Sequence, residues 1–179
     1  NMKKRILTAV LAAALVTGTC AATVSAKEEK TYTIGICQLV QHDALDAATK
    51  GFEDAITEKM GDSVKFDEQN AQGDSNTCST IINSFVSEGA DLILANATAS
   101  LQAAAAGTSD IPILGTAVTE YGVALGIDDF DGTVGGNISG TSDLAPLDEQ
   151  ADMLHELFPD AKNVGLLYCS AEPNSQYQV

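Results

Sequence analysis

Short apolar segments alternate with amphipathic ones along most of this chain, and this alternation is the feature that most constrains its fold. Buried strands are predicted where the segments are short, apolar and rich in β-branched residues, at 31–38, 64–69, 91–95 and 112–116. Helices are predicted between them, at 44–60, 75–88 and the Ala-rich 98–106. Strands that alternate with helices imply βαβ units, and hence a parallel sheet covered on both faces.

The rhythm changes in the second half of the chain. We expect a fifth, shorter strand over 123–127, and then a Gly- and Asp-rich segment, 128–142, that breaks the pattern. A helix over 147–158 and a strand over 163–168 follow. One side of that helix would carry Ala151, Leu154, Leu157 and Phe158. The whole pattern predicts a doubly wound, Rossmann-like α/β lobe and a crossover into a second lobe.

The first 26 residues have the layout of a bacterial-type secretory signal. Three basic residues, Lys3, Lys4 and Arg5, precede an apolar run over 6–16 and a small-residue segment that ends at Ala26. This run is shorter than the roughly 20 residues that a membrane-spanning helix needs. We predict export to the periplasm or the outer face of the cell membrane, with cleavage after Ala26. The alternative is lipidation of Cys20, which would be the chain's only attachment to a membrane.

Composition narrows the range of partners. Residues 27–179 hold six basic and 25 acidic side chains, a net charge of −19, whereas nucleic acids require a basic surface. Three cysteines remain, Cys37, Cys78 and Cys169, with no CxxC and no Cys/His cluster, so we expect no metal site and no cofactor. Buried apolar packing is the expected role of all three cysteines. One disulfide in an exported protein remains an option, and the sequence does not choose the pair.

Enzyme motifs are absent from the sequence, and we predict a protein that is not an enzyme. It contains no GxGxxG after the first strand, no GxxxxGK[ST] and no GxSxG. Of the two histidines, His155 is expected on the surface of the helix before Pro159, and His42 in a loop.

Three polar loops follow predicted strands and are the candidate binding site. Ligands of open parallel sheets bind beyond the carboxyl ends of the strands, which points to residues 41–43, 96–100 and 116–120. The free N–H groups that open the helix at Thr98, with the hydroxyls of Thr98 and Ser100, suit a carboxylate. The alternative is that Thr98 or Ser100 only caps that helix.

An ordered series of motifs across the chain resembles a known family. The matching segments include 34–46 (IGICQLVQHDALD), 70–74 (NAQGD) and 136–143 (GNISGTSD), and continue at 51–52, 91–98, 111–119 and 158–168. The series is similar to the substrate-binding proteins of bacterial ABC transporters, in the tryptophan/aromatic amino-acid-like group with the type I periplasmic-binding-protein fold. The resemblance implies two α/β lobes that close on a ligand in the cleft between them.

The resemblance also implies a division of the chain and a set of ligand contacts. Residues 1–26 would be the signal peptide, 27–143 the N-terminal lobe, and 144–179 the beginning of an incomplete second lobe whose first cleft loop is 170–175. The Thr98–Ser100 amides would take the carboxylate of an amino acid, and Asp143 would face its ammonium. The full set of expected ligand-binding residues is Gln41, His42, Thr98, Ala99, Ser100, Thr116, Ala117, Ser142 and Asp143.

The function that the resemblance implies is extracytoplasmic capture of a small solute, an amino acid or a related compound. The captured solute would be delivered to the membrane permease and ATPase of an ABC importer. Two alternatives stay open. One is a ligand-sensing module of the same fold that feeds a receptor, and the other is an exported α/β enzyme that uses His42 and Asp43.

Overall fold

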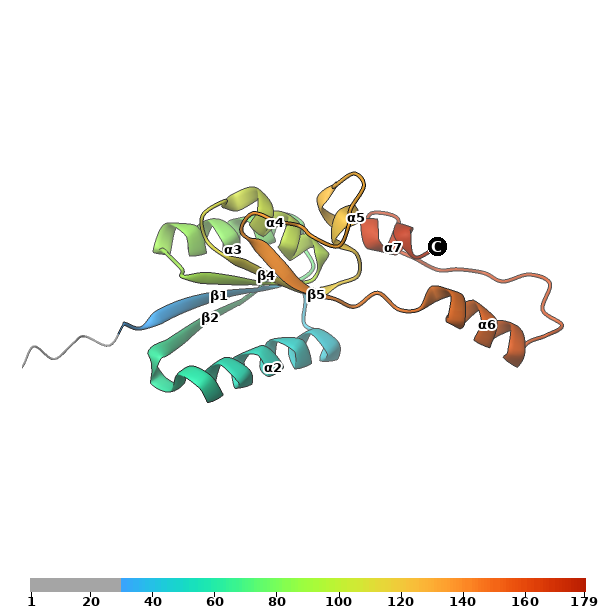
Figure 1. The fold of residues 1–179 in the computed structure, drawn as a ribbon, viewed down its shortest axis with the longest axis horizontal. Coiled ribbons are helices and arrows are strands. Elements are labelled where there is room, and N and C mark those ends of the chain that lie inside the picture. The colour runs from blue at the N-terminus through green and yellow to red at the C-terminus, as the bar shows by residue number, and fades with distance from the viewer. Residues whose placement is uncertain (1–29) are drawn as a thin grey trace, which may run out of the picture.

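The computed structural model describes residues 30–179 and contains one five-stranded parallel sheet with the strand order β2-β1-β3-β4-β5 (Figure 1). The predicted signal segment and Cys20 lie outside the described residues. The first four strands lie where the apolar pattern predicts them. The strands are β1 (Tyr32–Gln38), β2 (Val64–Asn70), β3 (Leu92–Asn96), β4 (Ile113–Val118) and β5 (Ile138–Ser142).

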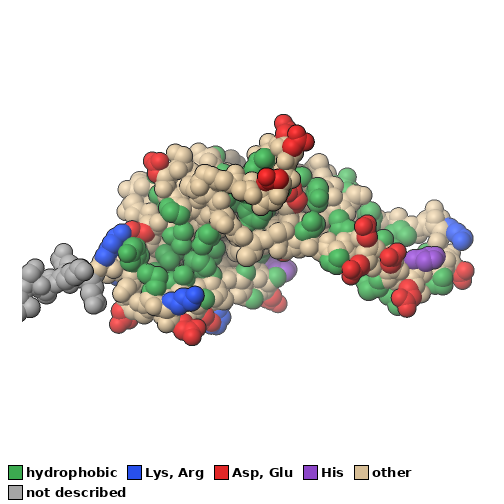
Figure 2. All heavy atoms as spheres, viewed as in Figure 1, with side chains coloured by type: hydrophobic (Ala, Val, Ile, Leu, Met, Phe, Trp, Pro, Cys, Tyr) green, Lys and Arg blue, Asp and Glu red, His purple; other side chains and the backbone are tan. Residues whose placement is uncertain are grey.

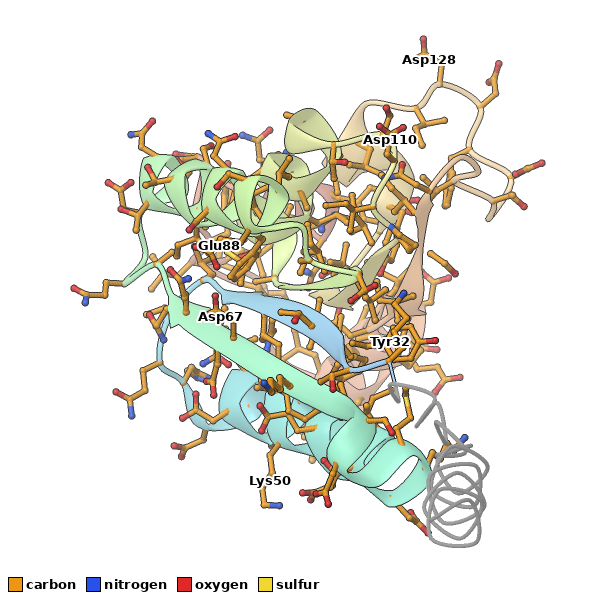
Figure 3. The ribbon with its side chains drawn as sticks, turned by 90° about the vertical axis from the view of Figure 1, so that its left-hand side faces the viewer. Tyr32, Lys50, Asp67, Glu88, Asp110 and Asp128 are labelled. Carbon is orange, nitrogen blue, oxygen red and sulfur yellow. The ribbon has the colours of Figure 1, made fainter. Side chains whose placement is uncertain are left out.

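Helices cover the two faces of this sheet in different amounts. On one face α2 (Asp43–Met60) packs Phe52 and Ile56 against Ile34, Ile36 and Leu94. On the other face α3 (Ser75–Glu88) and α4 (Thr98–Gly107) enclose the larger core (Figures 1 and 3). The short helix η1 (Gly61–Ser63) leads from α2 into β2. The predicted doubly wound α/β fold is therefore confirmed.

The larger core depends on a close approach between β1 and α3. Gly35 lies in the middle of β1 and Phe85 is buried in α3, where only 1% of it is exposed. A Cβ atom added at Gly35 would come within 2.5 Å of Cδ2 of Phe85. Since real Cβ atoms do not approach other atoms so closely, only glycine lets this ring pack so near the strand.

The prediction of a strand over 123–127 is wrong, because α5 (Tyr121–Leu125) occupies that segment. The carboxylate of Glu120 accepts hydrogen bonds from the N–H groups of Gly122 and Val123, and Gly126 ends the helix with a φ of 67°. These are helix-capping features that outweigh the β-branched composition of so short a segment. The fifth strand, β5, instead comes from the end of the Gly-rich segment, and Asn137 fixes its start by donating to the carbonyls of Thr108 and Ile111.

The chain after β5 extends away from the sheet (Figure 1). The predicted helix is present as α6 (Leu147–Leu157), but Leu154, Leu157 and Phe158 are exposed. The predicted strand over 163–168 is wrong, because the described residues offer it no partner strand and it stays exposed and irregular. A short helix, α7 (Pro173–Tyr177), then packs back against α5.

The charged surface of the molecule agrees with the acidic composition of the sequence. Acidic side chains are spread over the surface around the sheet and on α6 (Figure 2). His155 is exposed on α6, as predicted. Within residues 30–179, no helix combines the length and apolar character needed to cross a bilayer.

Candidate functional site

The carboxyl ends of β1, β3, β4 and β5 form one continuous rim. Backbone hydrogen bonds join neighbouring loops there, from Leu39 N to Asn96 O at 3.2 Å and from Ala97 N to Thr116 O at 3.0 Å. The hydroxyl of Ser142 donates to Thr119 O at 2.6 Å and links the last two strands. The parallel sheet thus brings the loops that carry the predicted site residues to the same edge, as expected.

The amino end of α4 is the most distinctive part of this rim. Side chains cap α2, α3 and α5, whereas Ala97 stands at the N-cap of α4 and no side chain caps that helix. The alternative that Thr98 or Ser100 caps its own helix is therefore wrong. The first backbone N–H groups of α4 stay without a side-chain acceptor, and the helix dipole favours an anion at that end.

Two alanines of the rim have unusual backbone conformations. Ala97 has a φ of 89° and Ala117 a φ of 52°, at the ends of β3 and β4. Residues other than glycine rarely adopt a positive φ, and residues strained in this way cluster at binding and catalytic sites. The strain therefore marks the same two loops that the strand ends indicate.

Thr98 and Ser100 face different surroundings, although both are buried. The hydroxyl of Thr98 lies on the rim and accepts a hydrogen bond from a side chain later in the chain, Asn174. The hydroxyl of Ser100 points into the core, 3.5 Å from Cys37 Sγ and 3.6 Å from Cys78 Sγ. The Ser100 hydroxyl therefore does not lie on the rim, and only the backbone N–H of this residue lies at the start of α4.

The three cysteines differ in burial. Cys37 and Cys78 are free and buried as predicted, and the hydrogen bond to Cys78 together with burial raises the pKa of the Cys37 thiol. Cys169 is exposed, so the prediction of burial is wrong for it, because its segment lies outside the packed part of the chain.

The loop after β1 places Gln41 and His42 at the edge of the rim, and both are exposed. His42 is the N-cap of α2, where its Nδ1 accepts a hydrogen bond from Ala44 N at 3.2 Å. This cap gives His42 a structural role beside Asp43. Residues 30–179 also contain no group of three or more side chains able to hold a metal ion.

The carboxyl ends of β4 and β5 carry Thr116, Ala117 and Ser142, and Asp143 follows β5 directly. Thr116 and Ala117 are half-buried, whereas Ser142 and Asp143 are exposed. Asp143 N donates to Val118 O at 3.1 Å, which ties the chain leaving β5 to the end of β4. Burial, with a contribution from the charge of Asp143, raises the pKa of the nearby Tyr121 phenol to about 12.

A buried polar network lies under the rim, and the sequence analysis did not predict it. Thr49 donates to Gln38 Oε1 at 2.7 Å, and Asn96 Nδ2 donates to Thr49 Oγ1 at 2.9 Å. Gln38 also donates to Asp46 at 2.5 Å and to Val40 O at 3.0 Å. The network fixes the β1–α2 loop to the end of β3. Polar residues that end otherwise apolar strands, Gln38 and Asn96, are the signal that could have found it.

Asn174 is the second functional candidate that the predicted set lacks. It is 2% exposed, and its side chain lies between Thr98 and the backbone of Glu120. The resemblance placed residues 170–175 at a cleft, but it gave no reason to single out this side chain.

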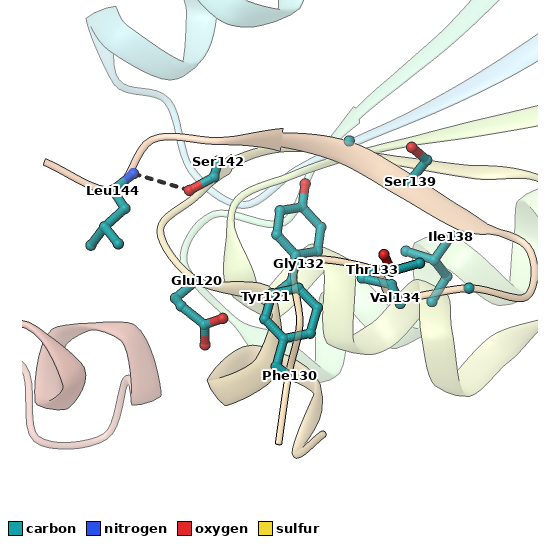
Figure 4. Close-up of a pocket in the computed structure, with 12 residues that line it drawn as sticks. Glu120, Tyr121, Phe130, Gly132, Thr133, Val134, Ile138, Ser139, Ser142 and Leu144 are labelled. Atoms are coloured by element: carbon teal, nitrogen blue, oxygen red, sulfur yellow. Dashed lines mark hydrogen bonds between the residues drawn. The ribbon is translucent and has the colours of Figure 1, made fainter. Parts of the chain in front are cut away.

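A cavity adjoins the rim at Glu120 and Ser142. It has a volume of about 490 Å³, runs along the outer edge of β5, and is lined by Tyr121, Phe130, Val134 and Ile138 (Figure 4). A second cavity of about 390 Å³ lies under β4 and β5 beside Phe52 and Leu94. Of the predicted site residues, Ser142 lines the first cavity and Thr116 the second.

Comparison with known proteins identifies the family of this chain. Residues 33–179 match the family described as ABC transporter substrate binding protein. The chain belongs to the ABC transporter substrate-binding protein family. A curated relative, the tyrosine-binding protein of Clostridioides difficile (strain R20291), is 46% identical over 154 residues, which make up 84% of this chain.

Solved structures of the same kind share the fold. An ABC domain from Streptococcus pneumoniae in complex with L-Trp has a TM-score of 0.77 and 35% identity over 83% of this chain. The ligand-free, open structure of a substrate-binding protein with adhesive properties from Clostridium difficile has a TM-score of 0.67 and 42% identity over 83% of this chain. A conserved domain protein from Vibrio cholerae has a TM-score of 0.76 and 32% identity over the same share.

The chain spans 44% of the curated relative and 51% of each of these solved chains. The family assignment indicates a binding role rather than an enzymatic one.

Proposed function

We propose that this chain captures an amino acid at the carboxyl rim of its sheet. The observation that carries the proposal is the amino end of α4, which no side chain caps and where Thr98 is buried at the rim. Free N–H groups at a helix N-terminus favour a carboxylate, which every free amino acid has. Relatives whose names refer to tyrosine binding and to a complex with L-Trp support an aromatic amino acid as the ligand.

The ligand's groups are assigned to different parts of the rim. The backbone N–H groups of Thr98, Ala99 and Ser100 and the Thr98 hydroxyl hold the carboxylate. Asp143, exposed at the end of β5, faces the ammonium group. The remaining expected contacts come from the loop after β1, which carries Gln41 and His42, and from the carboxyl ends of β4 and β5, which carry Thr116, Ala117 and Ser142.

The proposed division of the chain into two lobes is supported by the end of the sheet. Residues 27–143 form the N-terminal lobe, since the sheet ends at Ser142, and residues 144–179 begin the second lobe. The ligand lies between the two lobes, and its higher affinity for the closed arrangement shifts the equilibrium toward closure. The protein works outside the cytoplasmic membrane and delivers the amino acid to the permease and ATPase of an ABC importer.

Calorimetric titration with matched ligands tests this function. L-Tyrosine and L-tryptophan should bind, whereas tyramine and tryptamine, which keep the ring and the ammonium but lack the carboxylate, should bind at least about tenfold more weakly. Equal affinity for the amines would show that the start of α4 does not hold a carboxylate. Binding by neither amino acid would move the ligand to another chemical class.

A further inference from the structure

The side chain of Asn174 already bridges two loops of the rim. Its Nδ2 donates to Thr98 Oγ1 at 3.0 Å, and its Oδ1 accepts from the N–H of Glu120 at 3.2 Å. Asn174 lies 76 residues after Thr98 and 54 residues after Glu120 in the sequence. Because the side chain is 2% exposed, water does not compete for either bond.

A few polar contacts attach α7 and its flanking residues to the rim. Glu172 caps α7 by accepting from Ser175 N at 2.5 Å, and Gln178 Nε2 donates to Thr119 Oγ1 at 3.2 Å. Every residue from 148 to 171 is exposed, so no extensive packing holds this part of the chain against the sheet. A segment attached by a few polar contacts can leave the rim at low cost.

The two groups that hold Asn174 can also hold a carboxylate, because the Thr98 hydroxyl belongs to the proposed carboxylate site and the Glu120 N–H is a free donor once Asn174 leaves. A primary carboxamide and a carboxylate are both planar and place two heteroatoms on one carbon. The Glu120 N–H donates to either, and the Thr98 hydroxyl can accept from an amide or rotate to donate to a carboxylate oxygen. Only one occupant can use both partners at once, and the dipole of α4 favours a charged carboxylate over a neutral amide.

We propose that Asn174 occupies the carboxylate position of the rim in the ligand-free chain, and that an amino acid binds only after displacing it. The inference rests on the proposed function for the chemistry of the displacing ligand. Asn174 therefore competes with the ligand and sets the affinity of the site. If it were instead a ligand contact from the second lobe, its removal would weaken binding.

Two variants at this position give opposite predictions for the affinity. Asn174→Ala removes the competitor and should tighten L-tyrosine binding about tenfold, as expected from the loss of hydrogen bonds that the ligand must otherwise break. Asn174→Asp keeps a tethered occupant with a full negative charge and should weaken L-tyrosine binding below that of the unmodified chain. Asn83→Ala, an exposed position on α3, is the matched control and should leave the affinity unchanged.

Amide hydrogen exchange, followed by NMR, tests the contact without any ligand. Exchange of the Glu120 N–H should be about tenfold or more faster in Asn174→Ala. The Val123 N–H, which the Glu120 carboxylate holds, serves as the internal reference and should keep its rate. An unchanged Glu120 rate overturns the inference, because it would mean that Asn174 does not hold this group.

The affinity measurements and the hydrogen-exchange measurement together separate this inference from the proposed function. If L-tyrosine binds the unmodified chain and binds Asn174→Ala equally or more weakly, the function stands and the displacement is refuted. If neither L-tyrosine nor L-tryptophan binds any form, the proposed ligand and its displacement of Asn174 both fail. In that case the Glu120 exchange rate still shows whether Asn174 holds the rim.

Discussion

At the scale of residues, Gly35 shows that the core leaves no space for even one added methyl group between β1 and α3. Gly35→Ala places a Cβ against the Phe85 ring and should lower the free energy of unfolding by about 1–3 kcal/mol, the usual range for overpacking. Gly51→Ala is the matched control, because Gly51 lies inside α2 with no atom within 4 Å of the added Cβ. That variant should instead stabilise the chain by about 0.5–1 kcal/mol. Urea denaturation of both variants measures the difference, and equal effects would contradict the packing described.

Tyr121 connects a single ionisation to stability at high pH. Its pKa rises from 10.0 to about 12 in the folded chain, chiefly through burial. The folded state therefore holds this proton more tightly than the unfolded state does. The resulting stabilisation is complete below pH 10 and is lost as the pH rises from 10 through 12.

Tyr121→Phe should flatten the fall in unfolding free energy across this pH range. Absorbance at 295 nm follows the phenolate directly and should lose its phase centred at about 12. Asp143→Asn is the accompanying variant, since removing that charge should move the phase to lower pH. A phenolate phase of Tyr121 centred near 10 would contradict the burial of this ring.

At the scale of elements, α6 exposes an apolar side that nothing in the described chain covers. Leu157 and Phe158 are 64% and 60% exposed. Leu157→Glu combined with Phe158→Glu should reduce binding of a hydrophobic dye and aggregation, with a change in stability within about 0.5 kcal/mol. His155→Glu adds charge to the same helix without removing apolar surface, and should leave dye binding unchanged. A loss of stability in the double variant would mean that α6 packs on the sheet.

Element types followed from the sequence where one local pattern had no competitor. The period of the apolar residues predicted β1 to β4, α2, α3, α4 and α6, and the last of these kept its helical form without its expected packing. The predicted strand over 123–127 and the end of the Gly- and Asp-rich segment, 138–142, were assigned wrongly because both lie where local turn chemistry and long-range pairing compete. Caps at Glu120 and Gly126 outweighed strand propensity, and pairing with β4 made a strand from Gly- and Ser-rich residues.

The site was predictable to the level of its loops and not of its side chains. Chain order and a parallel sheet are sufficient to bring strand ends to one rim. They do not determine that the Ser100 hydroxyl faces two core thiols, or that Asn174 reaches Thr98 from 76 residues away. Both depend on side-chain directions in the folded chain, which a one-dimensional pattern does not contain.

At the scale of the whole molecule, the central claim is the place where an amino acid binds. The rim has the uncapped α4 and the strained loops, whereas the larger cavity lies along β5. The two places meet at Glu120 and Ser142, so amides that belong to only one of them distinguish the two in an NMR spectrum. The β5 cavity is marked by Val134 and Ile138, and the rim by Thr98, Ala99 and Ala117.

The measurement that decides between them is an amide NMR titration of the ¹⁵N-labelled chain with L-tyrosine. The account predicts saturable shifts that concentrate at Thr98, Ala99 and Ala117, with Val134 and Ile138 unchanged. Shifts confined to Val134 and Ile138 would contradict it, because the ligand would then occupy the β5 edge and not the carboxyl rim.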